Sequence, residues 1–279
     1  MLVGYNISNV INNKTLDKAI EDGSNYIQVF TSDPCSFFSN TKNFNGDLLK
    51  TYKKNKLLDY VIHGSFLINF CRLPDDKITK NSINLLKRDL YICEKIKALG
   101  VIIHMGKDTG KLGKEKAFNM YVENLNKVLE DTKHLKSIII LETGAGCGTE
   151  IATRLNELAK LREFCINKDR VKFCIDTCHI YSAGYDLSEE IIVDSLENYI
   201  DNTLGWDNVI VAHINDSKEC YNSRKDKHAD ITDGDISKKD LKVFMKFLNY
   251  FKKRNIPMIL ETPSDSIDYK TQIQTLNIY

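Results

Sequence analysis

The chain has 279 residues, of which 42% are hydrophobic and 28% charged, and its formal net charge is +1. This length suits one α/β barrel domain over residues 1–279, and the balanced charge excludes a uniformly basic nucleic-acid-binding protein. The apolar runs are far shorter than the roughly 20 residues of a membrane span, and residues 1–5 have the character of a strand and not of a targeting signal. We therefore expect an intracellular protein without a membrane partner, with its eight cysteines reduced.

Eight short runs rich in Val and Ile are predicted to be strands. Gly, Asn, Asp or Lys bounds each run, and the continuous apolar character is typical of strands buried on both faces of a parallel sheet. The predicted strands are residues 2–7, 26–30, 60–62, 101–103, 137–141, 171–175, 209–212 and 257–260.

Stretches with helical spacing lie between the strands, and Thr149 and Ser188 are predicted to stand at two of the helix starts. The predicted helices are residues 16–22, 47–56, 79–99, 115–131, 149–167, 188–202 and 237–254. Regular alternation of strand and helix indicates a (β/α)₈ TIM barrel. A doubly wound open sheet is the competing architecture, but no Gly-x-Gly-x-x-Gly turn follows the first strand.

Potential metal ligands stand at the end of six predicted strands. They are His63, His104, Glu142, Asp176, His213 and Glu261. The carboxyl ends of barrel strands share one rim, where the active sites of TIM barrels lie. Three further candidates, His179, Asp226 and His228, are predicted on loops of that rim, with His179 on the loop above Asp176.

A cluster of these residues requires cations. Each residue alone is better explained as a hydrogen-bonded core or rim group, but four carboxylates gathered at one rim would repel one another without positive charge. Nine ligands exceed the four or five of a single zinc ion, which indicates two or three divalent metals such as zinc or manganese. His134 is expected at the opposite rim and has no predicted role.

The candidate ligands stand within longer motifs. These are Val-Ile-His-Gly-Ser-Phe-Leu-Ile-Asn at 61–69, Ile-His-Met-Gly at 103–106, Leu-Glu-Thr-Gly-Ala-Gly-Cys-Gly at 141–148, Asp-Thr-Cys-His at 176–179, Gly-Tyr-Asp-Leu at 184–187, His-Ile-Asn-Asp-Ser-Lys at 213–218, Asp-Lys-His at 226–228 and Leu-Glu-Thr-Pro at 260–263. Through these motifs the chain resembles the endonuclease IV family of apurinic/apyrimidinic (AP) endonucleases along nearly its whole length. The resemblance implies a (β/α)₈ barrel that carries three zinc ions, with manganese able to replace part of them.

By this resemblance, each of three ligand sets would hold one ion. The sets are His63, His104 and Glu142; Glu142, Asp176, His213 and Glu261; and His179, Asp226 and His228. The implied reaction is hydrolysis of the phosphodiester 5′ to an abasic site by a metal-bound hydroxide, with Glu142 and Glu261 as catalytic residues. It leaves a 3′-hydroxyl and a 5′-deoxyribose phosphate. Double-stranded DNA with abasic or 3′-blocked lesions would be the partner, trimming of 3′ ends a second activity, and the protein a monomer.

The predicted DNA contacts depart from the family pattern. Phe66 stands where the family usually has Tyr, next to the apolar Leu67, and Lys227 stands where it usually has Arg. The loop of residues 31–36 lacks the Arg that often inserts into the DNA stack. We expect Phe66 and Leu67 to act as the wedge, and Lys218, Arg224 and Lys227 to contact phosphates.

Two other functions compete with this hypothesis. Sugar isomerases and epimerases with a related barrel bind one metal through a Glu, Asp, His, Glu set, which Glu142, Asp176, His213 and Glu261 could supply. That function would leave the remaining ligands unused. A lesion-binding protein without catalysis is the second alternative, and the complete set of ligands argues against it.

Overall fold

The computed structural model describes residues 1–7, 10–37 and 43–279. Within them, eight parallel strands close into a barrel in the order β1-β10-β7-β6-β5-β4-β3-β2. The prediction of a (β/α)₈ TIM barrel is confirmed. The barrel strands are β1 (Val3–Ile7), β2 (Tyr26–Phe30), β3 (Asp59–His63), β4 (Val101–Ile103), β5 (Ile139–Glu142), β6 (Val171–Asp176), β7 (Val209–His213) and β10 (Met258–Leu260).

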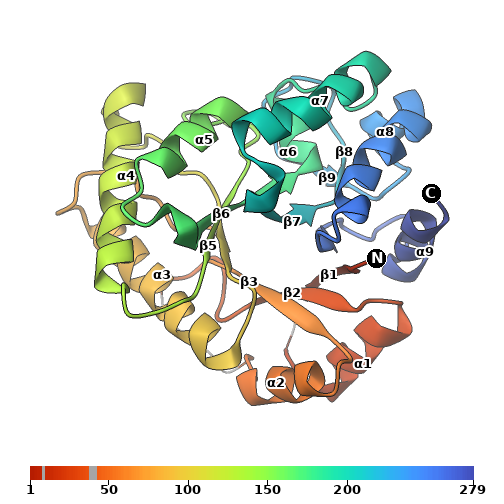
Figure 1. Ribbon diagram of the computed structural model, residues 1–279, viewed down its shortest axis with the longest axis horizontal. Coiled ribbons are helices and arrows are strands. Elements are labelled where there is room, and N and C mark those ends of the chain that lie inside the picture. The colour runs from red at the N-terminus through yellow and green to blue at the C-terminus, as the bar shows by residue number, and fades with distance from the viewer. Residues whose placement is uncertain (8–9, 38–42) are drawn as a thin grey trace.

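Helices surround the strands on the outside of the barrel (Figure 1). The α-helices are α1 (Asn13–Glu21), α2 (Gly46–Lys54), α3 (Lys77–Ile96), α4 (Lys114–Asp131), α5 (Leu155–Glu163), α6 (Thr177–Ala183), α7 (Glu190–Thr203), α8 (Asp235–Lys253) and α9 (Tyr269–Ile278), and short 3₁₀ turns are η1 (Lys168–Arg170) and η2 (Trp206–Asn208). None of the helices in the described ranges is long and apolar enough to cross a membrane.

Helix α3 shows how the sequence forms this outer layer. Leu86, Leu90 and Cys93 recur at helical spacing and are buried against the barrel. The Asp76 side chain accepts a hydrogen bond from the Ile78 backbone N–H and begins the helix, and Lys97 ends it in the left-handed conformation.

The predicted helix start at Thr149 is wrong. Residues 149–154 are not helical, because their backbone pairs with the loop after β4: Ile151 donates to the Gly106 carbonyl, and the Asp108 N–H donates to the Thr149 carbonyl. Ala152 has a positive φ of 50°, which also prevents a helix. Helix α7 likewise begins at Glu190, after an N-cap at Glu189, and not at Ser188.

Two helices were not predicted. Helix α6 follows β6 directly and contains His179, which was predicted to lie on a loop. All seven of its residues are buried, so the sequence has no polar face that would reveal its helical period. Helix α9 is capped by the Asp268 side chain and packs beside β1.

The interior of the barrel changes from apolar to polar toward one end. An apolar layer takes one residue from each of seven strands: Tyr26, Val61, Ile102, Ile140, Cys174, Val211 and Ile259. Because side chains alternate between the two faces of a strand, the residues two positions later point into the same interior. Those residues are Gln28, His63, His104, Glu142, Asp176, His213 and Glu261. The polar layer therefore lies at the carboxyl ends of the strands.

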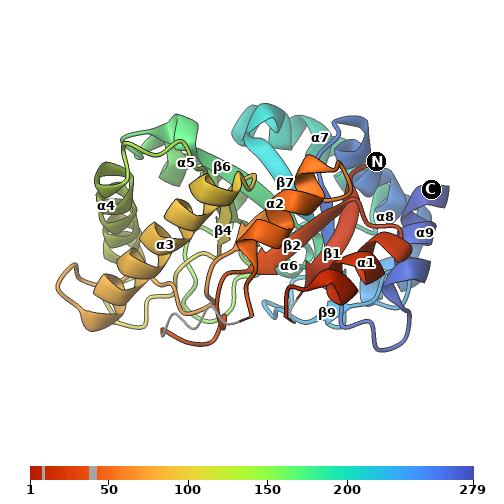
Figure 2. The ribbon, with the colours of Figure 1, turned by 90° about the horizontal axis from the view of Figure 1, so that it is seen from below.

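A small hairpin covers this end of the barrel. Strands β8 (Asp216–Ser217) and β9 (His228–Ala229) pair antiparallel and lie outside the barrel sheet. In the side view of Figure 2, β9 lies toward the lower edge of the molecule and the N-terminus toward the upper edge. The N-terminus begins β1, so the carboxyl ends of the parallel strands lie on the same side as β9. The hairpin therefore carries His228 to the same end as the polar layer.

Candidate metal centre

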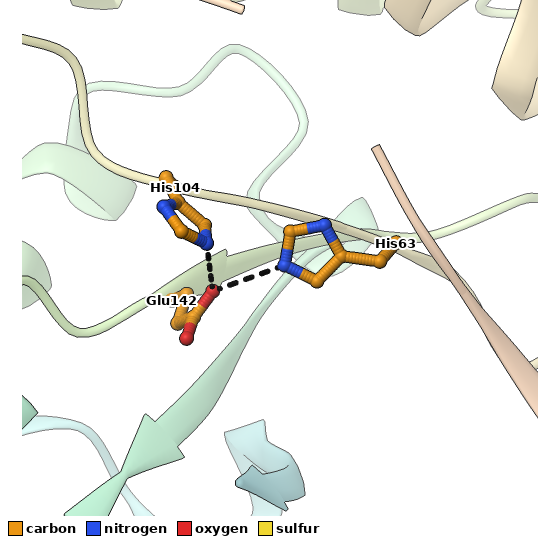
Figure 3. Close-up of side chains that lie close together, drawn as sticks. All are labelled: His63, His104 and Glu142. Carbon is orange, nitrogen blue, oxygen red and sulfur yellow. Dashed lines mark ion pairs between the residues drawn. The ribbon is translucent and has the colours of Figure 1, made fainter. Parts of the chain in front are cut away.

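The first ligand group joins three neighbouring strands. The Nε2 atoms of His63 and His104 lie 3.4 and 3.1 Å from the same oxygen of Glu142, Oε2. Figure 3 shows the two rings converging on this carboxylate. His63 Nδ1 lies 2.7 Å from the Gly64 carbonyl, which holds the ring with Nε2 pointing inward.

The second group shares Glu142 with the first. His213 Nδ1 lies 2.8 Å from Glu142 Oε1, 3.1 Å from Glu261 Oε2 and 3.8 Å from Asp176 Oδ2. The two oxygens of Glu142 thus face different histidine groups. Asn215 supports this arrangement, because its amide N–H donates to Asp176 Oδ2 at 2.7 Å and its amide oxygen accepts from the Glu261 backbone N–H.

The third group lies between α6 and the hairpin. The Nε2 atoms of His179 and His228 are both 3.1 Å from Asp226 Oδ1. His179 Nδ1 lies 2.7 Å from the Thr143 carbonyl, and the Asp176 carboxylate accepts a hydrogen bond from the His179 backbone N–H at 2.8 Å. Asp176 therefore caps helix α6 and also joins the second group.

These residues fit divalent metal ions. Several converging atoms are buried without a hydrogen-bond partner in the described structure: His63 Nε2, His179 Nε2, His228 Nε2 and Glu142 Oε2. Two ligand atoms about 2.0–2.1 Å from a tetrahedral zinc ion are about 3.3 Å apart, close to the separations of the first and third groups. The separations in the second group, from 2.8 to 3.8 Å, lie on both sides of this value, so each group has the donor atoms to hold one ion.

The electrostatics of the cluster reflect its unlike charges. Burial favours a neutral Glu142, but His104 and His213 outweigh it and hold the pKa of this carboxyl well below its ordinary value. Burial likewise opposes a charge on His179, but Asp176 and Asp226 raise its pKa well above its ordinary value. Because the pKa of His179 is raised, an incoming metal ion must displace a proton from this ring.

The predicted wedge lies at the mouth of this centre. Phe66 is 48% exposed, and its ring centroid lies 5.4 Å from those of the His63 and His104 rings. Leu67 beside it is half-buried. The Phe66 backbone N–H donates to the Pro34 carbonyl at 3.0 Å, so the loop of residues 31–36 supports the wedge although it lacks an arginine.

The three predicted phosphate contacts are exposed but unequal. Lys227 is held by the Glu219 carboxylate at 2.7 Å, and Lys218 lies 3.8 Å from Asp265. The Arg224 side chain lies over Gly146. A Cβ at position 146, which glycine lacks, would be only 2.8 Å from Arg224 Cδ, so the close approach depends on this glycine. By contrast, His134 lies outside the cluster and pairs with the Tyr91 hydroxyl.

Two polar residues of the centre were not predicted, Gln28 and Asn215. Gln28 is the single amide in an otherwise apolar strand, two positions after the inward-facing Tyr26. The alternation of side chains along a strand, with a period of two residues, would have placed Gln28 beside the ligands. Asn215 follows His213 by two positions, but it lies beyond the end of β7, where the period of a strand no longer fixes the direction of a side chain.

The fold and the three ligand groups together define a metal-dependent enzyme of the TIM-barrel class. Residues 16–277 match the model of the xylose isomerase-like TIM barrel family. A putative endonuclease 4 from Acanthamoeba polyphaga mimivirus is 37% identical over 80% of this chain and 76% of its own. A probable endonuclease 4 from Aster yellows witches'-broom phytoplasma is 35% identical over 94% of this chain and 89% of its own.

A solved structure agrees in fold. The crystal structure of endonuclease IV from Thermus thermophilus superposes with a TM-score of 0.80 and 23% identity, over 100% of this chain and 98% of that one. On the sequence relatives, the chain belongs to the endonuclease IV family of metal-dependent AP endonucleases.

Proposed function

We propose that the protein is a zinc-dependent DNA-repair enzyme that hydrolyses the phosphodiester 5′ to abasic sites in duplex DNA. The products are a 3′-hydroxyl and a 5′-deoxyribose phosphate, and blocked 3′ ends are trimmed at the same centre. Three zinc ions, with manganese as a partial substitute, would occupy the three ligand groups. The protein would act as a monomer, as one domain over residues 1–279, where the genome is repaired inside the cell.

The position of Glu142 is the observation that carries this proposal. Its two oxygens face different histidine groups, at 3.1 Å from His104 and 2.8 Å from His213. A carboxylate in this position can bridge two ions. Paired ions supply Lewis-acid stabilisation of phosphate oxygens and lower the pKa of water, the chemistry that phosphodiester hydrolysis requires.

The remaining residues orient the substrate around this pair. Glu261 is 13% exposed, more than Asp176 or His213 of the same group, so its carboxylate lies nearest the opening and can position the attacking water. Phe66 and Leu67 at the mouth would fill the space that an extruded sugar leaves in the duplex. Lys218, Arg224 and Lys227 would bind the flanking phosphates.

A single-metal sugar isomerase or epimerase is the alternative function. It would use only Glu142, Asp176, His213 and Glu261, and it gives no reason for His179 and His228 to converge on Asp226. A non-catalytic lesion-binding protein would have no need of a carboxylate whose two oxygens face different histidine groups, as those of Glu142 do. Metal content and strand cleavage separate all three functions.

The decisive experiment is cleavage of a duplex that carries one tetrahydrofuran abasic analogue, together with the metal content of the same sample. We expect a nick on the 5′ side with a 3′ end that a polymerase extends, and two to three ions per chain. Binding without a nick by the fully metal-loaded protein would support the lesion-binding alternative. One ion per chain and no nick would favour the sugar enzyme.

A further inference from the structure

Gln28 belongs to the polar layer but is not among the metal ligands. It lies on β2 and is completely buried. It follows the apolar Tyr26 by two residues, as His63 follows Val61 and His213 follows Val211, so its amide points into the same interior. A buried amide among charged ligands must be hydrogen-bonded, and its partners indicate what it does.

Both ends of the Gln28 amide contact ligands of the second group. The amide oxygen lies 2.8 Å from His213 Nε2, and the amide nitrogen donates to Glu261 Oε1 at 2.6 Å. A weaker contact of 3.4 Å joins the nitrogen to Asn6 Oδ1 on the neighbouring strand. One side chain on β2 therefore connects ligands from two other strands, His213 and Glu261.

These contacts determine which atoms remain for a metal. An amide oxygen only accepts hydrogen bonds, so it selects the tautomer of His213 with the proton on Nε2 and leaves the Nδ1 lone pair free. Nδ1 is the atom that faces Glu142 and Glu261. The amide nitrogen only donates, so it occupies Oε1 of Glu261 and leaves Oε2 turned toward the same point.

We propose that Gln28 is a positioning residue of the metal centre, which fixes the tautomer of His213 and the rotamer of Glu261 so that both face one ion. The inference rests on the proposed metal centre and adds a residue to it. Methionine has a similar shape but makes neither contact. Glutamate keeps an acceptor for His213 but sets a second carboxylate against Glu261.

The experiment compares Gln28→Met and Gln28→Glu with the parent after loading with zinc. Loss of a residue that orients metal ligands weakens metal binding about 10- to 100-fold. We therefore expect competition with a chelator to remove one ion from Gln28→Met at about 10- to 100-fold lower chelator concentration, while the other ions leave as in the parent. Native mass spectrometry counts the ions, and turnover should fall with little change in KM.

Imidazole ¹⁵N spectra of the zinc-loaded proteins test the mechanism directly. The parent and Gln28→Glu should show His213 with its proton on Nε2, because residue 28 accepts a hydrogen bond from it. In Gln28→Met, which offers no acceptor, the His213 signal should be broadened or exchanging. In Gln28→Glu, binding of the ion should still be weakened, because the hydrogen-bond donor to Glu261 is lost. Parent-like metal binding by this variant would overturn the proposed role toward Glu261.

Asn124→Leu is the matched control. Asn124 is a buried amide on α4 that donates at 2.9 Å to the carbonyls of Phe70 and Arg72, so its loss also removes two hydrogen bonds. It should lower the thermal stability and leave metal binding unchanged. Equal metal loss in both variants, or none in Gln28→Met, would overturn the inference about Gln28. Failure of the parent to bind metal would instead overturn the proposed function.

Discussion

Replacing Phe66 by alanine tests how the protein holds its lesion. The ring packs against those of Phe30, His63 and His104, with centroids 5.4 Å apart in each pair, and 48% of the residue remains exposed at the mouth of the metal centre. This exposed part of the residue is available for contact with a base next to the abasic nucleotide. We expect Phe66→Ala to weaken binding of abasic duplex and to slow its cleavage.

The size of the effect follows from these contacts. Stacking of an aromatic side chain on a base contributes about 1–3 kcal/mol, which corresponds to about 5- to 150-fold weaker binding. Each ring pair within the protein contributes about 0.5–1.5 kcal/mol to folding. Phe66→Ala should therefore melt somewhat earlier and remain folded. Leu67→Ala should act in the same direction with a smaller effect, since Leu67 is half-buried and has no ring.

Single-turnover cleavage with protein in excess measures both quantities, since the concentration dependence gives the affinity and the plateau gives the rate. Metal content is determined in the same samples, because Phe66 touches the ligands His63 and His104. Phe164→Ala is the control: Phe164 is 54% exposed and packs edge-on against Phe118, and it follows α5 at the opposite end of the barrel.

A 3′-blocked end frays without help and needs less wedging, so its trimming should be less affected by Phe66→Ala. The wedge hypothesis is wrong if both substrates lose activity in proportion, or if neither does. It is also wrong if Phe164→Ala weakens abasic-duplex binding as much as Phe66→Ala does.

Three further outcomes are expected. Glu261→Gln should keep the fold and DNA binding but lose most turnover, because a neutral amide is a poor metal ligand. His134→Ala is the control and should cleave like the parent. Near-normal cleavage by Glu261→Gln would mean that the metal centre is wrongly assigned. Prolonged chelation should abolish cleavage and lower the melting temperature, since ionised Glu142 and its neighbours lose the cations that balance them, and full activity with metal shown to be absent would contradict this. Zinc affinity of the metal-free protein should rise with pH up to about 9: burial lowers the pKa of His228, but Asp176 and Asp226 raise it to about 9, and zinc must displace that proton. Calorimetry in two buffers of different ionisation enthalpy would detect the released protons, and their absence would refute it.

The strands and most of the ligands could be predicted from the sequence because both depend on short-range order. A run of Val and Ile ending in a polar residue fixes which side chains share the barrel interior, since the period of two is a property of the strand itself. His63 and His213 were therefore expected at one rim, where the structure places them. The grouping of the ligands came only from the family resemblance, and the structure brings the same sets together.

Other features depended on contacts between distant segments. Thr149 has the residue type of a helix start, but the loop after β4 takes its carbonyl as a hydrogen-bond acceptor. Helix α6 is buried on all sides, so its period is invisible in the sequence. Gln28 shows the same limit at the site, since its sequence position gives its direction but not its partners. His213 and Glu261 come within 2.8 and 2.6 Å of it only because the barrel closes and brings the ends of β7 and β10 within reach of β2.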